Sequence, residues 1–127
     1  MNKFLFATLI ISLLLVGNIE AQSKKALFPD TPGMVSYTYR DSFKKDVAAT
    51  LDTLQAMGIK DMEFSNLFGK TAADLRTMLD ERNIYCSSFG VSYADLMEKT
   101  DQVGENAKTL GAKYVRIAWI PHTAPFD

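Results

Sequence analysis

The chain has 127 residues, a formal net charge of −1 and a single cysteine. This length allows one domain with a core large enough to be stable. Lys and Arg number 14 against 15 Asp and Glu, so the composition lacks the basic excess that marks nucleic-acid binding. The single cysteine, Cys86, cannot form an internal disulfide, and the apolar stretch around it predicts a buried, unreactive thiol.

The first residues are typical of a secretory signal peptide. A positively charged end at residues 1–3 precedes an apolar run at 4–17, and the small residue Ala21 follows. The run is shorter than the roughly 20 residues of a membrane-spanning helix, which favours cleavage after Ala21 over an uncleaved anchor. We expect residues 1–21 to be removed and residues 22–32 to form a polar lead-in. The mature protein would then be secreted or periplasmic, without a membrane association.

Three later segments, 41–58, 70–83 and 92–111, share a pattern that predicts helices. Their apolar residues recur at helical spacing: Phe43, Val47, Leu51 and Leu54 in the first, Leu75, Met78 and Leu79 in the second, and Leu96, Val103, Ala107 and Leu110 in the third. Each helix would therefore present one apolar side to a core.

Residues that favour helix ends lie at the borders of these segments. Asp41 or Ser42 can begin the first helix, and Thr71 with Asp74 makes a variant of the capping box for the second. The residues that can end the three helices are Gly58, Asn83 and Gly111. Gly104 is a weak point within the third segment and argues against one straight helix there.

A short apolar run precedes the first helix, and another follows each helix. These runs cover residues 33–40, 59–66, 84–91 and 112–119. Strands that alternate with helices in this way form parallel sheets with right-handed crossovers. The sequence therefore predicts an α/β domain over residues 33–127, with four parallel strands and three helices.

The strands can be aligned with one another by counting residues from the end of the helix that precedes each strand. Because side chains alternate along a strand, this alignment assigns each residue to one of the two faces of the sheet. The residues expected to face the helices are Met62, Phe64, Ser87, Phe89, Val115 and Ile117. Glu63, Ser88 and Arg116 fall on the opposite face. Both faces of an open doubly wound sheet are apolar, so this polar face favours the interior of a (β/α)8 TIM barrel near its mouth. Because a complete barrel has about 250 residues, we expect the N-terminal half of one.

Four passages also stand in a characteristic order and spacing. They are Tyr37 followed by Arg40 and Asp41, the passage MGIKDMEF with Glu63, the stretch FGKTAADLRTMLDE, and LGAKYVRIAWIP. Together they resemble the start of the sugar phosphate isomerase/epimerase family, the xylose-isomerase-like TIM barrels, and most of all its secreted bacterial members. The resemblance covers about residues 33–125 and rests on order and spacing, since no single passage is a catalytic signature.

This resemblance implies isomerisation or epimerisation of a sugar or sugar phosphate, with a divalent metal such as Mn²⁺ held by Glu, Asp and His. In the family, the metal ligands and the Glu pair that transfers the proton come mainly from the second half of the barrel. Many members have a His at the end of the third strand, where this chain has Phe89 and Gly90. We therefore expect this chain alone to bind no metal and to be inactive.

Glu63 is the strongest candidate for a functional residue. Its carboxylate can bind a sugar hydroxyl or orient a metal-bound water, and the alternative is an ion pair with Arg116 inside the barrel. The two roles of Glu63 are compatible, because an interior Arg can neutralise a Glu and orient it.

His122 follows the fourth strand, at a position where the loop belongs either to an active site or to the plain surface. Glu63 and Asp127 are its conceivable metal partners, but no ligand spacing such as HxH or HExxH is present, so a complete metal site is not expected.

Two aromatic residues complete the candidates for substrate binding, which are Glu63, His122, Tyr37, Trp119 and Arg116. Tyr37 and Trp119 can present flat faces to a sugar ring, although aromatic residues at strand ends more commonly belong to the core.

The leading hypothesis is the N-terminal part of a secreted sugar isomerase or epimerase that acts by metal-assisted proton transfer next to a carbonyl. The alternative is a non-catalytic half-barrel that binds sugar or acts as a scaffold after self-association through its open strand edges. A third function, metal-dependent action on DNA, occurs in the same superfamily. The neutral charge and the signal peptide argue against it.

Overall fold

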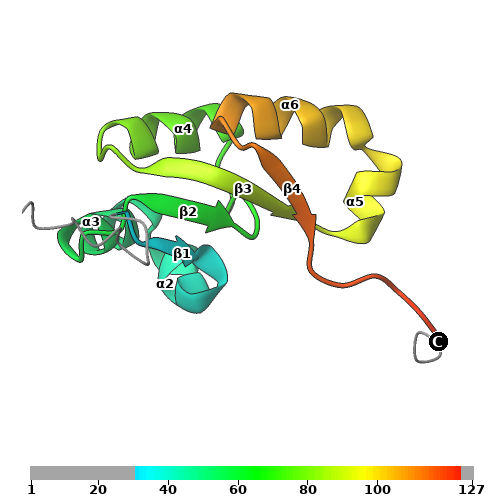
Figure 1. Cartoon of the computed structure of the whole chain (residues 1–127), viewed down its shortest axis with the longest axis horizontal. Helices are drawn as coiled ribbons and strands as arrows, with labels where there is room; N and C mark the ends of the chain where they lie inside the picture. The colour runs from blue at the N-terminus through cyan, green and yellow to red at the C-terminus, as the bar shows by residue number, and fades with distance from the viewer. Residues whose placement is uncertain (1–30, 124–127) are drawn as a thin grey trace, which may run out of the picture.

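The sheet of this protein is wholly parallel and follows the order of the chain. The computed structural model describes residues 31–123. Within them, β1 (Gly33–Val35), β2 (Asp61–Phe64), β3 (Tyr85–Val91) and β4 (Tyr114–Ile117) pair in the order β1-β2-β3-β4 (Figure 1). The expected α/β fold with four parallel strands is confirmed. The proposed signal peptide at residues 1–21, most of the lead-in and Asp127 lie outside the described residues.

Helical segments follow each of the first three strands. They are the 3₁₀ turn η2 (Ser36–Tyr39), α2 (Arg40–Lys45), α3 (Val47–Ala56), α4 (Ala72–Asp80), α5 (Tyr93–Glu98) and α6 (Thr100–Leu110). The first and third predicted helices are therefore each divided in two, and only the second is a single helix. No helix between residues 31 and 123 has both the length and the apolar character needed to span a membrane.

One hydrophobic core lies between the sheet and the helices. Its largest fully buried apolar side chains are Phe43, Leu51, Leu54, Met62, Phe64, Leu75, Leu79, Ile84 and Leu110. They come from β2, from the residue before β3 and from α2, α3, α4 and α6, and α4 and α6 lie side by side along the sheet (Figure 1). The predicted apolar sides of the helices are confirmed, although Met78 and Leu96 are only half-buried.

The first predicted helix is divided at Asp46. This residue has an extended backbone (φ −156°, ψ 110°), and its carboxylate accepts a hydrogen bond from the Ala49 amide at 3.0 Å. It therefore caps α3, whereas α2 begins without a side-chain cap. The expected cap at Asp41 or Ser42 is wrong, because the residue that satisfies a free helix amide stands at the later break.

The third predicted helix is divided at Lys99, and Gly104 lies within α6. Ser92 caps α5 by accepting a hydrogen bond from the Asp95 amide at 3.0 Å, and Lys99 then leaves the helical conformation (φ −134°, ψ 38°). The three predicted helix ends all have positive φ values: Gly58 (81°), Asn83 (52°) and Gly111 (74°). Left-handed ends of this kind satisfy the last helix carbonyls, so these predictions are confirmed.

The first strand is shorter than the predicted run 33–40. Only Gly33–Val35 pairs with β2, and the chain turns into η2 at Ser36, whose buried hydroxyl accepts a hydrogen bond from the Ser65 amide at 2.8 Å. Tyr37 consequently lies on a 3₁₀ turn and is 60% exposed. Its expected place in the first strand is wrong, and it does not belong to the core.

The third strand contains a β-bulge that brings Cys86 to the helix-facing side. Met62 pairs with Cys86 and Glu63 pairs with Ser88, so Ser87 is the extra residue. Cys86 therefore packs into the core and is 3% exposed. The predicted burial of the cysteine is confirmed.

The register of the fourth strand differs from the expected one by two residues. Ser88 lies opposite Tyr114, and Gly90 lies opposite Arg116. A shift of two residues preserves the face on which a side chain lies, so Arg116 still shares the open face with Glu63. The β4 residues expected to pack on helices are Val115, which is 41% exposed, and Ile117, which is half-buried. Residues 118–123 form no helix that would cover them.

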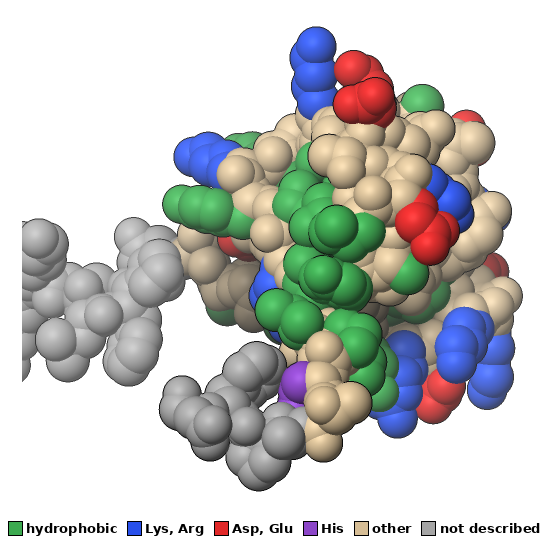
Figure 2. All heavy atoms as spheres, turned by 90° about the vertical axis from the view of Figure 1, so that its right-hand side faces the viewer, with side chains coloured by type: hydrophobic (Ala, Val, Ile, Leu, Met, Phe, Trp, Pro, Cys, Tyr) green, Lys and Arg blue, Asp and Glu red, His purple; other side chains and the backbone are tan. Residues whose placement is uncertain are grey.

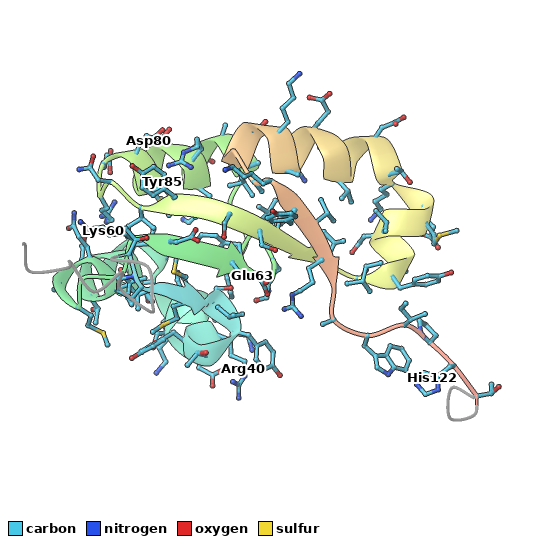
Figure 3. All side chains as sticks on the ribbon, in the orientation of Figure 1. Arg40, Lys60, Glu63, Asp80, Tyr85 and His122 are labelled. Atoms are coloured by element: carbon cyan, nitrogen blue, oxygen red, sulfur yellow. The ribbon has the colours of Figure 1, made fainter. Side chains whose placement is uncertain are left out.

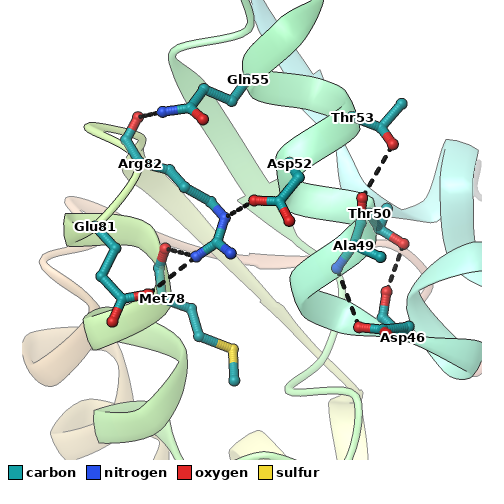
Figure 4. Close-up of polar contacts among 9 residues, drawn as sticks. All are labelled: Asp46, Ala49, Thr50, Asp52, Thr53, Gln55, Met78, Glu81 and Arg82. Atoms are coloured by element: carbon teal, nitrogen blue, oxygen red, sulfur yellow. Dashed lines mark hydrogen bonds and ion pairs between the residues drawn. The ribbon is translucent and has the colours of Figure 1, made fainter.

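A polar cluster fastens the end of α4 to α3 (Figure 4). The Arg82 Nε donates to Asp52 Oδ1 at 2.7 Å, and its Nη1 donates to the Met78 carbonyl at 2.8 Å. The hydrogen bond with Asp52 is the main cause that raises the pKa of Arg82 above its ordinary value. Because the Arg82 side chain is only 13% exposed, solvent screens this ion pair less than a fully exposed one.

Thr71→Ala is expected to lower the free energy of unfolding by about 1 kcal/mol. The Thr71 hydroxyl accepts from the Asp74 amide at 3.0 Å, so the substitution leaves that amide of the first turn without its partner. Equilibrium unfolding in denaturant, followed by circular dichroism, measures the change. Thr77→Ala, at an exposed site within the same helix, is the control and should change stability by less than about 0.5 kcal/mol. An equal decrease in the free energy of unfolding in the two variants would contradict the capping role of Thr71.

Burial raises the pKa of the Cys86 thiol to about 11, from an ordinary value of 9.0. The unfolded chain therefore loses this proton at lower pH than the folded chain. We expect the contribution of Cys86 to stability to be complete below pH 9 and to be lost as the pH rises to about 11. Denaturant unfolding across this range tests the expectation, with Cys86→Ala as the control that lacks this slope. An identical slope in both proteins would refute it.

Candidate functional site

An ion pair lies on the open face of the sheet, near the carboxyl ends of the strands. The Glu63 carboxylate on β2 contacts the Arg116 guanidinium on β4, and β3 runs between them. The Glu63 side chain is 17% exposed and that of Arg116 is 44% exposed. The predicted ion pair is confirmed, and Figure 3 shows Glu63 toward the carboxyl end of β2.

Small residues on β3 allow this pair to form across an intervening strand. Ser88 lies opposite Glu63, and Gly90 lies opposite Arg116. Neither residue places a bulky side chain on the open face, so the long Arg116 side chain can extend over β3 to the carboxylate. The positive guanidinium thereby attracts the carboxylate and orients it.

The ends of β1 and β2 are joined by a pair of serines. The Ser36 and Ser65 hydroxyls lie 2.9 Å apart, and the Ser65 amide donates to the Ser36 hydroxyl at 2.8 Å. Ser36 is fully buried. These contacts fix the position at which the chain leaves each strand, and therefore the edge of the sheet next to Glu63.

Gly90 brings β3 close to the loop that follows β2. A Cβ atom at this position would lie 3.2 Å from both the Phe64 carbonyl oxygen and the Ser65 Cα. These distances are tighter than ordinary van der Waals contacts, and both partners are backbone atoms. The glycine that stands near the expected place of a family histidine thus serves close backbone packing.

Tyr37 and Arg40 interact with each other on the surface. The Arg40 guanidinium lies over the Tyr37 ring at 4.6 Å from its centroid, and Arg40 Nη1 donates to the Tyr37 carbonyl at 3.2 Å. This is a cation–π pair at an exposed site. The structure therefore joins Tyr37 to its own turn and does not bring it to the Glu63–Arg116 pair.

Trp119 and His122 lie on the segment that leaves β4. Their ring centroids are 6.2 Å apart at an interplanar angle of 40°, and Trp119 is 64% exposed. Figure 3 shows His122 far along this segment, away from Glu63. The expectation that Trp119 belongs to the core is wrong for the described chain. The structure thus unites two of the five candidate residues, Glu63 and Arg116.

The residues present do not fit the divalent metal that the family resemblance implies. Within residues 31–123, no three His, Cys, Asp or Glu side chains are grouped so that they could hold a metal ion. The Glu63 carboxylate contacts the positive Arg116, and Asp61 Oδ1 accepts a hydrogen bond from the Ser87 amide at 3.1 Å. A cation beside Glu63 would be repelled by the neighbouring guanidinium.

Sequence reasoning missed the polar residues that follow the strands. Ser36 was hidden within a run assigned to strand one, and Ser65 and Asn66 within a run assigned to strand two. The signal that could have found them is their residue type, because Ser and Asn favour turns over strand interiors. Comparisons with models of protein families, with curated protein sequences and with solved structures found no match for this chain.

A double-mutant cycle with Glu63→Gln and Arg116→Met should give a coupling energy of about 1 kcal/mol. The half-exposed Arg116 limits the value, because solvent screens the pair. Denaturant unfolding of the four proteins measures the coupling. Asp41→Asn and Lys44→Met form the control cycle, since that pair lies 3.6 Å apart with side chains 74% and 67% exposed. Coupling energies of similar size in both cycles would contradict the expectation that the partly buried position of Glu63 strengthens its ion pair with Arg116.

Proposed function

We propose that this chain supplies the N-terminal half of a secreted xylose-isomerase-like barrel that isomerises or epimerises a sugar or sugar phosphate. The observation that carries the proposal is the winding of the sheet. Four parallel strands follow one another in chain order, helices cover one face, and an ionised pair lies on the other. In a doubly wound sheet helices cover both faces, whereas a barrel keeps one face inside and gathers functional residues at the carboxyl ends of strands.

In this proposal Glu63 binds a hydroxyl group of the sugar, and Arg116 holds the carboxylate in place. The carboxylate is a hydrogen-bond acceptor, and the ion pair with the guanidinium orients it. Proton transfer next to the carbonyl needs a base that is matched to that task. The base and any metal ligands belong to the remainder of the barrel, since the described residues 31–123 contain no group that fits a metal.

A second candidate function is a scaffold or sugar-binding protein formed by two copies of this half. Exposed apolar residues lie on both edge strands: Val35 on β1 is 37% exposed, and Tyr114 and Val115 on β4 are 68% and 41% exposed. Figure 2, which views the carboxyl ends of β3 and β4, shows hydrophobic side chains gathered in a band across this face. Parallel pairing of each β4 with the partner's β1 about a twofold axis would give eight strands and remove both open edges.

The mass and the activity of the protein from producing cells test both candidates. An antibody against residues 33–123 should isolate a species of roughly 30 kDa, the size of a complete barrel. With Mn²⁺ added, this species should convert an aldose into its ketose or epimer, as followed by ¹³C NMR. Glu63→Gln should lower kcat/KM about tenfold or more, because it removes a charged hydrogen-bond acceptor. Glu105→Gln, at an exposed position on α6, is the matched control.

Each outcome separates the candidates. A species of roughly 30 kDa without activity toward any aldose or ketose would refute the isomerase proposal. A stable species no larger than the 14.2 kDa of the chain would refute the half-barrel as part of a longer protein. If that small species sedimented as a dimer, the second candidate would be supported.

A further inference from the structure

A cleft of about 430 Å³ lies on the helix side of the sheet, apart from the Glu63–Arg116 pair. It is bounded by the loop after β2, the end of β3, α5 and α6. Its apolar lining consists of Leu67, Phe89, Val91 and Val103. This volume is within the range of small-molecule sites. All lining residues lie between Ser65 and Asn106.

The charged side chains of the cleft neutralise each other. Lys99 Nζ donates to Asp95 Oδ1 at 3.0 Å, and the Ser92 hydroxyl donates to Asp95 Oδ2 at 2.6 Å. The hydrogen bond from Ser92, followed by the contact with Lys99, lowers the pKa of Asp95 below its ordinary value. Both charges are therefore engaged within the protein. The cleft presents no unpaired charge to a ligand, which favours a neutral molecule over an anion such as a phosphate.

Amide side chains supply the hydrogen-bonding groups of the rim. Gln102 Nε2 donates to Asn106 Oδ1 at 3.2 Å, and the Phe68 amide donates to Asn66 Oδ1 at 2.7 Å. Gln102 Oε1, Asn106 Nδ2 and Asn66 Nδ2 make no hydrogen bond with the described residues. The rim thus offers one acceptor and two donor groups. Such a set matches adjacent hydroxyl groups, each of which both donates and accepts.

The loop that carries Asn66 is fixed before any ligand binds. Gly90 allows it to approach β3 at backbone contact distance, and the Lys70 amide donates to the Leu67 carbonyl at 3.0 Å. A rim that is already ordered loses little conformational entropy on binding.

We propose that this cleft binds a neutral pyranose ring as a second site, separate from the face that carries Glu63. The C–H face of the ring would lie on the half-buried Leu67 and Val91, above the buried Phe89. Adjacent hydroxyls would bond to the amides of Asn66, Gln102 and Asn106. The apolar floor, the neutral charge and the amide rim all select this class of ligand. The site contains neither Glu63 nor Arg116, so its test is separate from that of the proposed isomerase activity.

NMR titration of the full ¹⁵N-labelled chain tests the proposal, with methyl β-D-xylopyranoside and xylotetraose as probes. We expect saturable shifts at the backbone amides of Asn66, Val91 and Gln102, with a Kd on the order of 1 mM. Tighter binding of xylotetraose would identify the end of a glycan chain as the ligand, and equal binding would identify a free monosaccharide. Glucose 6-phosphate should bind no better than the neutral glycoside.

Two substitutions and one control link the shifts to the rim. Asn106→Ala and Gln102→Ala should each weaken binding about tenfold, because each removes a hydrogen bond, and Ala favours the helix, so α6 should remain folded. Glu105→Ala, on the same helix but outside the cleft, should leave binding unchanged. No saturable shift with either neutral probe overturns the proposal, as do shifts confined to Glu63 and Arg116 or a preference for the phosphate. Unaltered binding by both variants, with the spectrum of a folded protein, overturns it as well.

Discussion

The burial of one face of the sheet under α3, α4 and α6 is the constraint on which the remaining features depend. All large apolar side chains that are fully buried belong to that single core in the described chain. Between residues 31 and 123 no helix packs on the opposite face, so a charged residue there keeps contact with solvent or finds a partner of opposite charge. Glu63 does both, because it retains some exposure and contacts Arg116. The polar face is therefore a consequence of the one-sided winding.

Much of the fold could be predicted because local signals and burial agree. The apolar spacing of Leu51 and Leu54, the cap at Thr71 and the left-handed end at Gly111 each rest on interactions within one helix. The breaks at Asp46 and Lys99 were not predicted. The apolar period continues through both positions, and only the backbone angles in the packed structure reveal the change of direction.

The face of the sheet that carries the candidate site could be predicted, but the pairing of residues between the strands could not. Alternation along a strand decides the face, and it correctly placed Glu63 and Arg116 together. Register depends on the bulge at Ser87 and on the displacement of β4, both of which arise from contacts between strands. Counting residues from the helix ends cannot detect an inserted residue. The contact between Ser36 and Ser65 could not be predicted for a similar reason, because it joins positions that are 29 residues apart in the chain.

The third strand connects the two surfaces that carry polar chemistry. Ser88 and Gly90 leave the open face clear for Arg116, while Phe89 and Val91 point to the helix side and line the cleft. A substitution that shifts β3 by one residue would exchange these sets, placing Phe89 between Glu63 and Arg116 and removing the floor of the cleft. The bulge at Ser87 therefore has a role beyond local geometry. It sets the alternation of the last residues of β3, and so assigns small residues to the face with the ion pair and apolar residues to the face with the helices.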